Sequence, residues 1–259
     1  MNYGLYLSAA GMLTAMHRMD VASNNLANVN TVGFKPDFAA AMQRLPERVE
    51  DGLYQIDSNT LLEKLGGGTL SMPTRTNFTT SPPEVTNNPM DVSILGEGLF
   101  VLDAASDDSG DAVKFSRDGR FTIGPAGNLV SSATGRAVLS EQNSPIRLDS
   151  TKPVHITTAG DVQQAGQTIA RLQIATVPDR DSLIKVGDNL YRADPKIAAR
   201  RHTTGSFVQP GAVESSGVNP IDTMMDITEA GEAVRNNSRI LEVHDEMMDR
   251  AINTFGRVN

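Results

Sequence analysis

The sequence predicts an α+β protein: helices at the two chain ends form a coiled-coil-like domain, joined to a central antiparallel all-β domain and an extended arm. Apolar residues recur at steps of three and four near both ends, which is the spacing of an amphipathic helix. In the central part they alternate with polar residues, as in half-buried strands. We expect an N-terminal helix in residues 1–35, the arm in 36–89, the β-rich domain in 90–214 and a C-terminal helix in 215–259.

Two stripes run along the predicted N-terminal helix. The apolar stripe consists of Leu5, Ala9, Met12, Met16, Met19 and Leu26. The stripe of small residues consists of Gly4, Ser8, Gly11, Ala15 and Ala22. A seven-residue apolar repeat favours a left-handed supercoil with a partner helix. Arg18 and Asp20 are the only charged residues among the first 30, so we expect this helix to be covered on more than one side. The alternative is a buried helix of an ordinary domain.

A run rich in asparagine follows this pattern, with Asn24, Asn25, Asn28 and Asn30. Asparagine disfavours helix interiors because its amide competes for backbone groups, and it suits caps and turns. Gly33 can adopt a positive φ and so stop the helix. The run therefore predicts that the helix ends in a turn rich in side-chain amides.

The predicted C-terminal helix has clear start and stop signals. Asn219 is a good N-cap, Pro220 suits the first helical position, and Gly256 suits the position just past the end. Its seven-residue repeat consists of Ile227, Val234, Leu241, Met248 and Phe255. A helix of this length spans roughly 50 Å, which is too long for one small core, and its natural partner is the N-terminal helix.

The arm has little core of its own. Between Pro36 and Pro46 we expect a short helix over Asp37–Arg44, and a helical turn over Leu61–Leu65. The following Gly66–Gly68 is no phosphate loop, because neither Lys-Ser nor Lys-Thr follows it. The Thr-, Asn- and Pro-rich stretch that comes next predicts extended backbone with turns.

Short strands with turn signals between them predict a run of antiparallel hairpins in the central domain. The first strands expected are Asp91–Leu95, Leu99–Leu102, Val113–Phe115, Arg120–Ile123 and Leu129–Ser131. The turn signals are Gly96–Gly98, Asp118–Gly119 and Gly127–Asn128. Further strands are expected at Ala137–Leu139, Val154–Thr157, Thr168–Val177 and Leu190–Arg192. The even spacing favours a sandwich-like or barrel-like domain.

Composition argues against several classes of function. The net charge of -8, without a Lys/Arg cluster, argues against nucleic acid as a partner. No cysteine is present, and the four histidines lie in unrelated segments, so we expect no metal, no cofactor and no catalysis. The acidic cluster Asp107–Asp111 is interpreted as a solvated hairpin tip rather than a calcium site. No apolar run is long enough for membrane insertion, and no cleaved secretory signal is recognisable.

Three stretches of the chain resemble the bacterial flagellar rod and hook proteins. The N-terminal stretch reads NNLANVNTVGFK, the central block contains GEGLFVL, KFSRDGRFTIGPAGNLV and TGRAVL, and the C-terminal stretch reads EMMDRAINTFGRV. One departure is at Glu232, Val234 and Arg235, where the family usually has Arg, an aromatic residue and Glu. The resemblance implies a structural subunit of the basal-body rod in the periplasmic space. Such a subunit is exported by the flagellar type III apparatus and polymerises through its terminal helices, with other copies and other rod proteins as partners, to transmit torque.

The resemblance also implies where assembly contacts lie. The expected interface residues are Leu5, Ala9, Met12, Met16, Met19, Leu26, Gly4, Gly11, Asn24, Asn25, Asn28, Ile227, Val234, Leu241, Met248 and Phe255. Phe34 and Phe38 resemble the Phe-x-x-x-hydrophobic element that rod subunits present to the export gate; the alternative is that they pack the helix end against the arm.

Alternatives remain for position and for class. The INTFGRV ending favours a proximal rod subunit, whereas the long arm favours a distal rod or hook-type subunit. In a different class, the chain is a dimeric adaptor whose β-domain binds a partner. Filament formation that rises with concentration, as opposed to a discrete dimer, separates these two classes.

Overall fold

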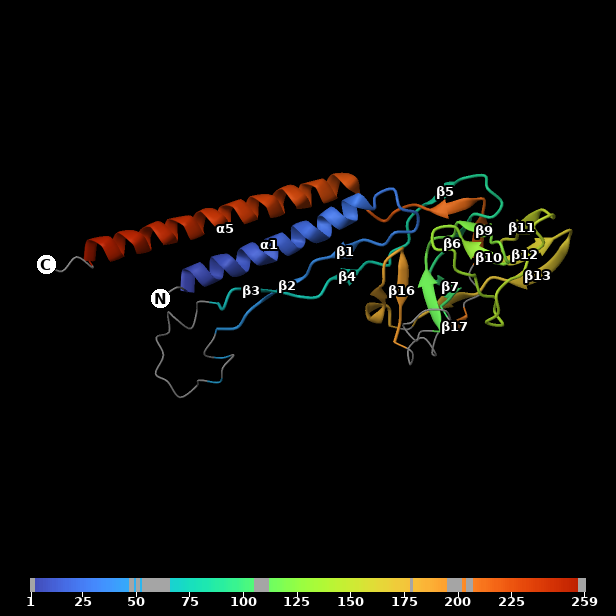
Figure 1. Cartoon of the computed structure of the whole chain (residues 1–259), viewed down its shortest axis with the longest axis horizontal. Helices are drawn as coiled ribbons and strands as arrows, with labels where there is room; N and C mark the ends of the chain where they lie inside the picture. Colours follow the sequence, from blue (N-terminus) through green and yellow to red (C-terminus); the bar gives the residue numbers. More distant parts are fainter. Residues whose placement is uncertain are drawn as a thin grey trace. The chain divides into compact units, whose positions relative to one another are not determined.

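The computed structural model describes residues 3–46, 49, 52, 66–104, 112–177, 179–194, 202–203 and 207–255 (Figure 1). Contacts divide the chain into two compact units. The helical unit consists of Met1–Ala27, Asp37–Asn77 and Asn219–Asn259, and the β unit consists of Asn28–Pro36 and Phe78–Val218. The predicted helical turn at Leu61–Leu65, the acidic cluster Asp107–Asp111 and the stop at Gly256 lie outside the described residues.

The two helices are α1, Tyr3–Ala27, and α5, Pro220–Phe255, which pack against each other (Figure 1). Helix α5 starts and ends where the sequence predicts. The Asn219 side-chain oxygen accepts the N–H of Ile221 at 3.1 Å, and its amide donates to Asp222 at 2.7 Å. The N-cap therefore satisfies a backbone donor that the helix itself leaves open.

Helix α1 ends at Ala27, so Asn24 and Asn25 lie in its last turns and Asn28 and Asn30 lie in the turn that follows, as the asparagine run predicts. The amide of Asn25 donates to the carbonyl of Asp37 at 2.7 Å and accepts the N–H of Asp37 at 3.0 Å. Because a neighbouring segment satisfies this amide, it does not compete for the helix backbone. The turn comes after Ala27 and includes Gly33 with φ +65°, as predicted.

The predicted helix over Asp37–Arg44 is wrong, because this segment forms two strands, β1 and β2. Strand β1, Asp37–Phe38, pairs with β4, Arg75–Thr76, and β2, Ala41–Gln43, pairs with β3, Thr69–Ser71. The local helix preference of the alanines yields to this long-range pairing and to packing on α1. We call these four strands the ribbon.

The β unit contains one six-stranded antiparallel sheet in the order β15-β16-β8-β7-β14-β17. Its strands are β7 Leu99–Asp103, β8 Val113–Ser116, β14 Ile174–Thr176, β15 Ile184–Lys185, β16 Leu190–Arg192 and β17 His202–Thr203. The smaller strands are β5 Pro83–Val85, β6 Val92–Leu95, β9 Phe121–Ile123, β10 Leu129–Ser131, β11 Val154–Ile156, β12 Asp161–Gln164, β13 Gln167–Arg171, β18 Phe207–Pro210 and β19 Ala212–Glu214. A single 3₁₀ turn, Arg180–Ser182, precedes β15 in the described part of the unit.

The large sheet is buried on both faces. Along β7, Phe100 and Leu102 enter one hydrophobic cluster, while Leu99 and Val101 enter a second cluster. Side chains alternate across a strand, so each cluster lies on its own side of the sheet. This explains why the run Leu99–Leu102 is apolar throughout.

Two of the three predicted hairpins are wrong. The turn at Gly127–Asn128 does join paired strands, β9 and β10. In contrast, β6 pairs with β18 rather than with β7, and the Asp118–Gly119 turn leads from β8 to a strand with which β8 does not pair. Gly119 serves close approach instead: a Cβ there would lie 1.7 Å from the carbonyl oxygen of Val92. The segment Ala137–Leu139 forms only isolated bridges.

No helix in the described ranges has both the length and the apolar content needed to cross a membrane.

Candidate assembly interface

The small stripe of α1 lies against α5 of the same chain. A Cβ at Gly4 would lie 2.9 Å from Nε2 of His244, and one at Gly11 would lie 3.3 Å from the Asn237 amide. Ala15 and Ala22 are each 6% exposed. The close approach that the small residues predict is therefore made within the chain.

A second face of α1 lies against the ribbon. Thr14 Oγ1 lies 3.1 Å from Thr69 Oγ1, and a Cβ at Gly68 would lie 3.0 Å from Leu7. The Asn25–Asp37 hydrogen bonds add a third contact at the other end of α1. Two sides of this nearly uncharged helix are thus covered within the helical unit.

The remaining face of α1 exposes large apolar side chains. They are Leu5, Tyr6, Leu13 and Met16, exposed by 37% to 64%. Helix α5 exposes Ile221, Met224, Met225, Ile240, Val243, Met247, Met248 and Ile252. Large exposed apolar side chains on both helices indicate protein interaction sites.

The predicted interface residues lie on several surfaces. Leu5, Met16 and Met248 are exposed, as is Asn24. Half-buried positions are Gly4, Ala9, Gly11, Met12, Met19, Leu26, Asn28, Ile227, Val234 and Leu241. Asn25 is buried, and the side chain of Phe255 lies outside the described residues. Sequence reasoning missed Tyr6, Leu13, Ile221, Met224, Met225, Ile240, Val243, Met247 and Ile252, because a seven-residue repeat selects one stripe per helix.

Phe34 and Phe38 differ in exposure and belong to different units of the chain. Phe34 is 6% exposed, and Nζ of Lys185 lies 4.3 Å from its ring centroid. Phe38, in β1, is 56% exposed. Pro36 lies between them and disfavours helical backbone at Lys35, so the two rings do not share a helix face. Phe38 lies in the extended strand β1 instead.

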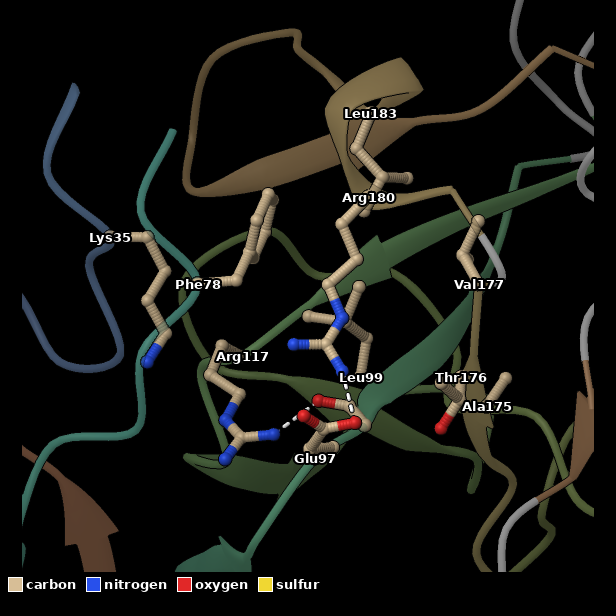
Figure 2. A pocket seen from close by; sticks show the side chains of 11 residues that line it. Lys35, Phe78, Glu97, Leu99, Arg117, Ala175, Thr176, Val177, Arg180 and Leu183 are labelled. Carbon is tan, nitrogen blue, oxygen red and sulfur yellow. Dashed lines mark hydrogen bonds and ion pairs between the residues drawn. The ribbon is translucent and has the colours of Figure 1, made fainter. Parts of the chain in front are cut away.

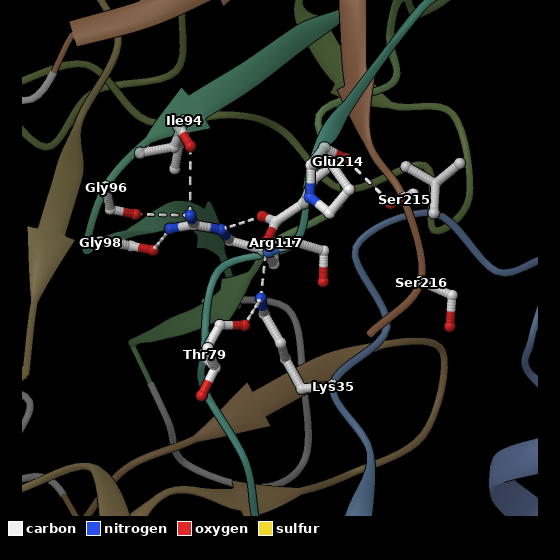
Figure 3. A network of polar contacts seen from close by, with 12 residues as sticks. Lys35, Thr79, Ile94, Gly96, Gly98, Arg117, Glu214, Ser215 and Ser216 are labelled. Carbon is white, nitrogen blue, oxygen red and sulfur yellow. Dashed lines mark hydrogen bonds and ion pairs between the residues drawn. The ribbon is translucent and has the colours of Figure 1, made fainter. Parts of the chain in front are cut away.

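The β unit contains a buried cluster of charges centred on Glu214 (Figure 3). Its carboxylate accepts hydrogen bonds from Nζ of Lys35 at 2.6 Å, from Nε of Arg117 and from the N–H of Ser81 at 2.7 Å. The Lys35 ammonium also donates to the carbonyl of Thr79 at 2.7 Å. The three charged side chains are at most 3% exposed.

Arg117 also donates to three backbone carbonyls, one in β6 and two in the β6–β7 connection. They are Ile94 at 3.2 Å, Gly96 at 2.6 Å and Gly98. Burial lowers the pKa of Lys35 below 10.5, while its hydrogen bond to Glu214 opposes that shift. Through these ion pairs and hydrogen bonds, the cluster joins five stretches of the β unit.

The pocket beside this cluster is small (Figure 2). Its lining includes Lys35, Phe78 and Arg117, with the Arg180–Glu97 ion pair, and its volume is about 20 Å³. That is room for a single water molecule rather than a substrate. The parts of the chain that the structure describes also contain no group of three or more potential metal ligands.

Large exposed apolar side chains on both helices are typical of a class of proteins that assemble with other chains. Comparison with known proteins finds matching families at both ends of the chain. Residues 5–35 match the family described as "Flagella basal body rod protein", and residues 209–254 match "Flagellar basal body rod FlgEFG protein C-terminal". The chain is therefore similar to flagellar basal-body rod proteins at both of its ends.

Curated relatives match over almost the whole chain. The flagellar basal-body rod protein FlgF of Caulobacter vibrioides is 28% identical, covering 100% of both chains. The rod protein FlgG of Bacillus subtilis is 29% identical, covering 96% of this chain and 97% of the relative. The flagellar hook-basal body complex protein FlhO of Bacillus subtilis is 25% identical, covering 98% and 99%.

The family is structural and not enzymatic, which agrees with the prediction made from the sequence. These relatives are named as components of the flagellar basal-body rod or of the hook-basal body complex.

Proposed function

We propose that this chain polymerises through its terminal helices into the rod, in which it transmits torque from motor to hook. The observation that carries the proposal is the exposed apolar surface on both α1 and α5. A helix that is packed on two sides and apolar on the third needs a further partner to remove that surface from water.

In this proposal the two helices form the coiled-coil-like axial domain of the subunit. The β-rich domain faces outward, and the arm orders against neighbouring subunits. The steps of three and four on both helices, and the packing of α1 on α5, support the first of these points.

The test compares two leucine-to-glutamate substitutions at exposed positions. Leu13 in α1 is 64% exposed, and Leu95 in the β unit is 48% exposed. Leu13→Glu should leave the chain folded but abolish rods and motility, because it places a charge in the polymer contact. Leu95→Glu should leave both unchanged. Normal motility of Leu13→Glu would refute assembly through this face, and a discrete dimer of the wild-type chain would favour an adaptor.

We also propose export without a cleaved signal, through the flagellar type III apparatus into the periplasmic space. Phe34 and Phe38 serve as the export element in the unfolded chain, where both rings are free to reach a hydrophobic site. Burying two phenyl rings contributes on the order of 3–5 kcal/mol before ordering costs, enough for a weak docking step. Replacing both with Ala should lower secretion while the cytoplasmic pool stays intact. Normal secretion with failed assembly assigns the pair to packing instead.

Within the rod we propose the proximal position, on the strength of the INTFGRV ending. Rod proteins named FlgF and FlgG both match over the whole length at similar identity. The layer that the chain occupies in a map of an isolated basal body tests the position, and a layer at the hook end would refute it.

A further inference from the structure

The first turns of α5 carry a hollow in their surface. Ile221, Met224 and Met225 line it and are 69%, 55% and 58% exposed, and Thr228 and Glu229 complete it. Its volume is about 370 Å³. We call it the α5 hollow.

An exposed aromatic side chain in the ribbon has the shape to enter such a hollow. Phe38 is 56% exposed, and its partner across the ribbon is the exposed Arg75. The thioethers of Met224 and Met225 offer the Phe38 ring a favourable contact. The Glu229 carboxylate offers the neighbouring Arg75 guanidinium an opposite charge. Phe38 and the α5 hollow are both exposed in the single chain, so neither covers the other within it.

Charge selects this occupant over other surfaces of a second copy. Among phenylalanines whose side chains the structure describes, Phe38 and Phe207 are the exposed ones. Phe207 pairs with Leu95, and the nearby Glu97 forms an ion pair with Arg180, so this surface would bring a compensated pair of charges rather than a cation towards Glu229. Helix α5 itself carries eight acidic residues and three arginines, so two copies of it repel each other.

We propose that Phe38 of one copy seats in the α5 hollow of the next copy, with Arg75 facing Glu229. This inference rests on the proposed polymerisation and names one of its contacts. The two surfaces differ and both belong to the helical unit, so each copy offers one and receives the other. Such a heterologous contact can repeat from copy to copy, and it produces an open-ended polymer where its rotation does not close a ring.

The first test uses the absence of native cysteine. One purified full-length variant carries Phe38→Cys and another carries Met225→Cys, and the two are mixed under mild oxidation at a concentration at which wild-type chains associate. The mixture should form a disulfide-linked pair. A matched mixture of Phe207→Cys with Met225→Cys should form at least about tenfold less, because the Arg180–Glu97 pair near Phe207 offers Glu229 no net positive charge.

The second test leaves Phe38 intact. Arg75→Glu and Glu229→Arg should each weaken association of copies about tenfold, and the two changes in one chain should restore it. Restoration is a result that damage to the fold would not produce.

Three outcomes overturn the inference. One is association of wild-type chains without the Phe38–Met225 disulfide, another is a stronger disulfide in the Phe207 mixture, and the third is a double charge variant no better than the single ones. If purified wild-type chains remain monomeric at every concentration tested, polymerisation itself is refuted. This result is distinct from the three above.

Discussion

Replacing Glu214 by Gln should destabilise the β unit severely. The substitution keeps the shape of the side chain but leaves Lys35 and Arg117 as two buried cations without their counter-charge. Removing one partner of a buried ion pair costs about 3–5 kcal/mol, because the remaining charge stays desolvated. For a unit of this size that lowers the melting temperature by about 10 °C.

The assay is calorimetric unfolding of the full chain with a matched control. Glu97→Gln removes the same charge from the surface pair with Arg180, in which the Glu97 side chain is 68% exposed, and should cost less than about 1 kcal/mol. Adding Lys35→Met to Glu214→Gln should recover part of the loss, because one unpaired cation is removed. Equal melting temperatures for Glu214→Gln and Glu97→Gln would refute the reasoning.

The same variant should respond to alkaline pH. Burial already holds the pKa of Lys35 below 10.5, and the loss of Glu214 removes the influence that raises it. Between the folded pKa and 10.5 the unfolded chain binds more protons, so stability rises with pH across that window. Stability of Glu214→Gln should therefore rise more steeply than that of the wild type as pH approaches 10.5. A flat profile would show that Lys35 is not left charged and buried.

Three further predictions concern local geometry. Gly11→Leu should lower the stability of the α1–α5 pair by about 1–3 kcal/mol, because the new side chain would push against Asn237. The measurement is thermal unfolding followed by helical circular dichroism. The control Gly231→Leu should be tolerated, because the nearest atom to a Cβ there belongs to Arg235 at 4.0 Å. In urea unfolding, Gly33→Ala should destabilise the β unit by about 1–3 kcal/mol more than Gly135→Ala. Both glycines have a similar positive φ, but a Cβ at Gly33 would lie 2.6 Å from the carbonyl oxygen of Arg117, whereas one at Gly135 would meet no atom within 4 Å. Equal losses would contradict this reasoning. Hydrogen bonds from the Thr151 hydroxyl and N–H, together with Lys152, lower the pKa of Asp149 to about 2. The stabilisation that the ionised Asp149 contributes is therefore present above pH 3.8 and is lost as the pH falls through about 2. In an NMR titration, Thr151→Ala should move the pKa of Asp149 towards 3.8.

The sequence predicts helix α5 correctly because its signals are local. Asn219 and Pro220 are adjacent, and the seven-residue repeat continues to Phe255. Strands β7 and β10 are predicted for a similar reason, since apolar runs and turn residues lie within a few positions of each other.

The errors all involve partners that are distant in sequence. The alanines near Asp37 favour a helix locally, but β3 and β4 begin about 30 residues later and pair with this segment. Likewise β6 pairs with β18, more than a hundred residues away, so the glycine turn after β6 gives a false hairpin signal. In both cases the pairing of a second segment overrides local preference.

The surface for assembly was predicted only in part, because a repeat identifies which residues share a stripe and not which partner covers it. The small stripe containing Gly4 and Gly11 is used within the chain. The exposed Leu13 and Met225 belong to neither predicted stripe. Periodicity thus identifies the two helices, whereas the free faces emerge only once the ribbon and α5 are placed against α1.

The charged cluster links the two segments by which the family is recognised. Lys35 is the last residue of the N-terminal match, and Glu214 lies near the start of the C-terminal match, 179 residues later. Around this ion pair, the N–H of Gly33 donates to the carbonyl of Glu214, and that of Gly217 donates to the carbonyl of Phe34. The ends of the β unit are therefore fastened to each other by a buried charge pair and two backbone hydrogen bonds. A break at Glu214 should consequently loosen both ends of the β unit together, whereas the hydrophobic clusters on the two faces of its sheet involve neither residue.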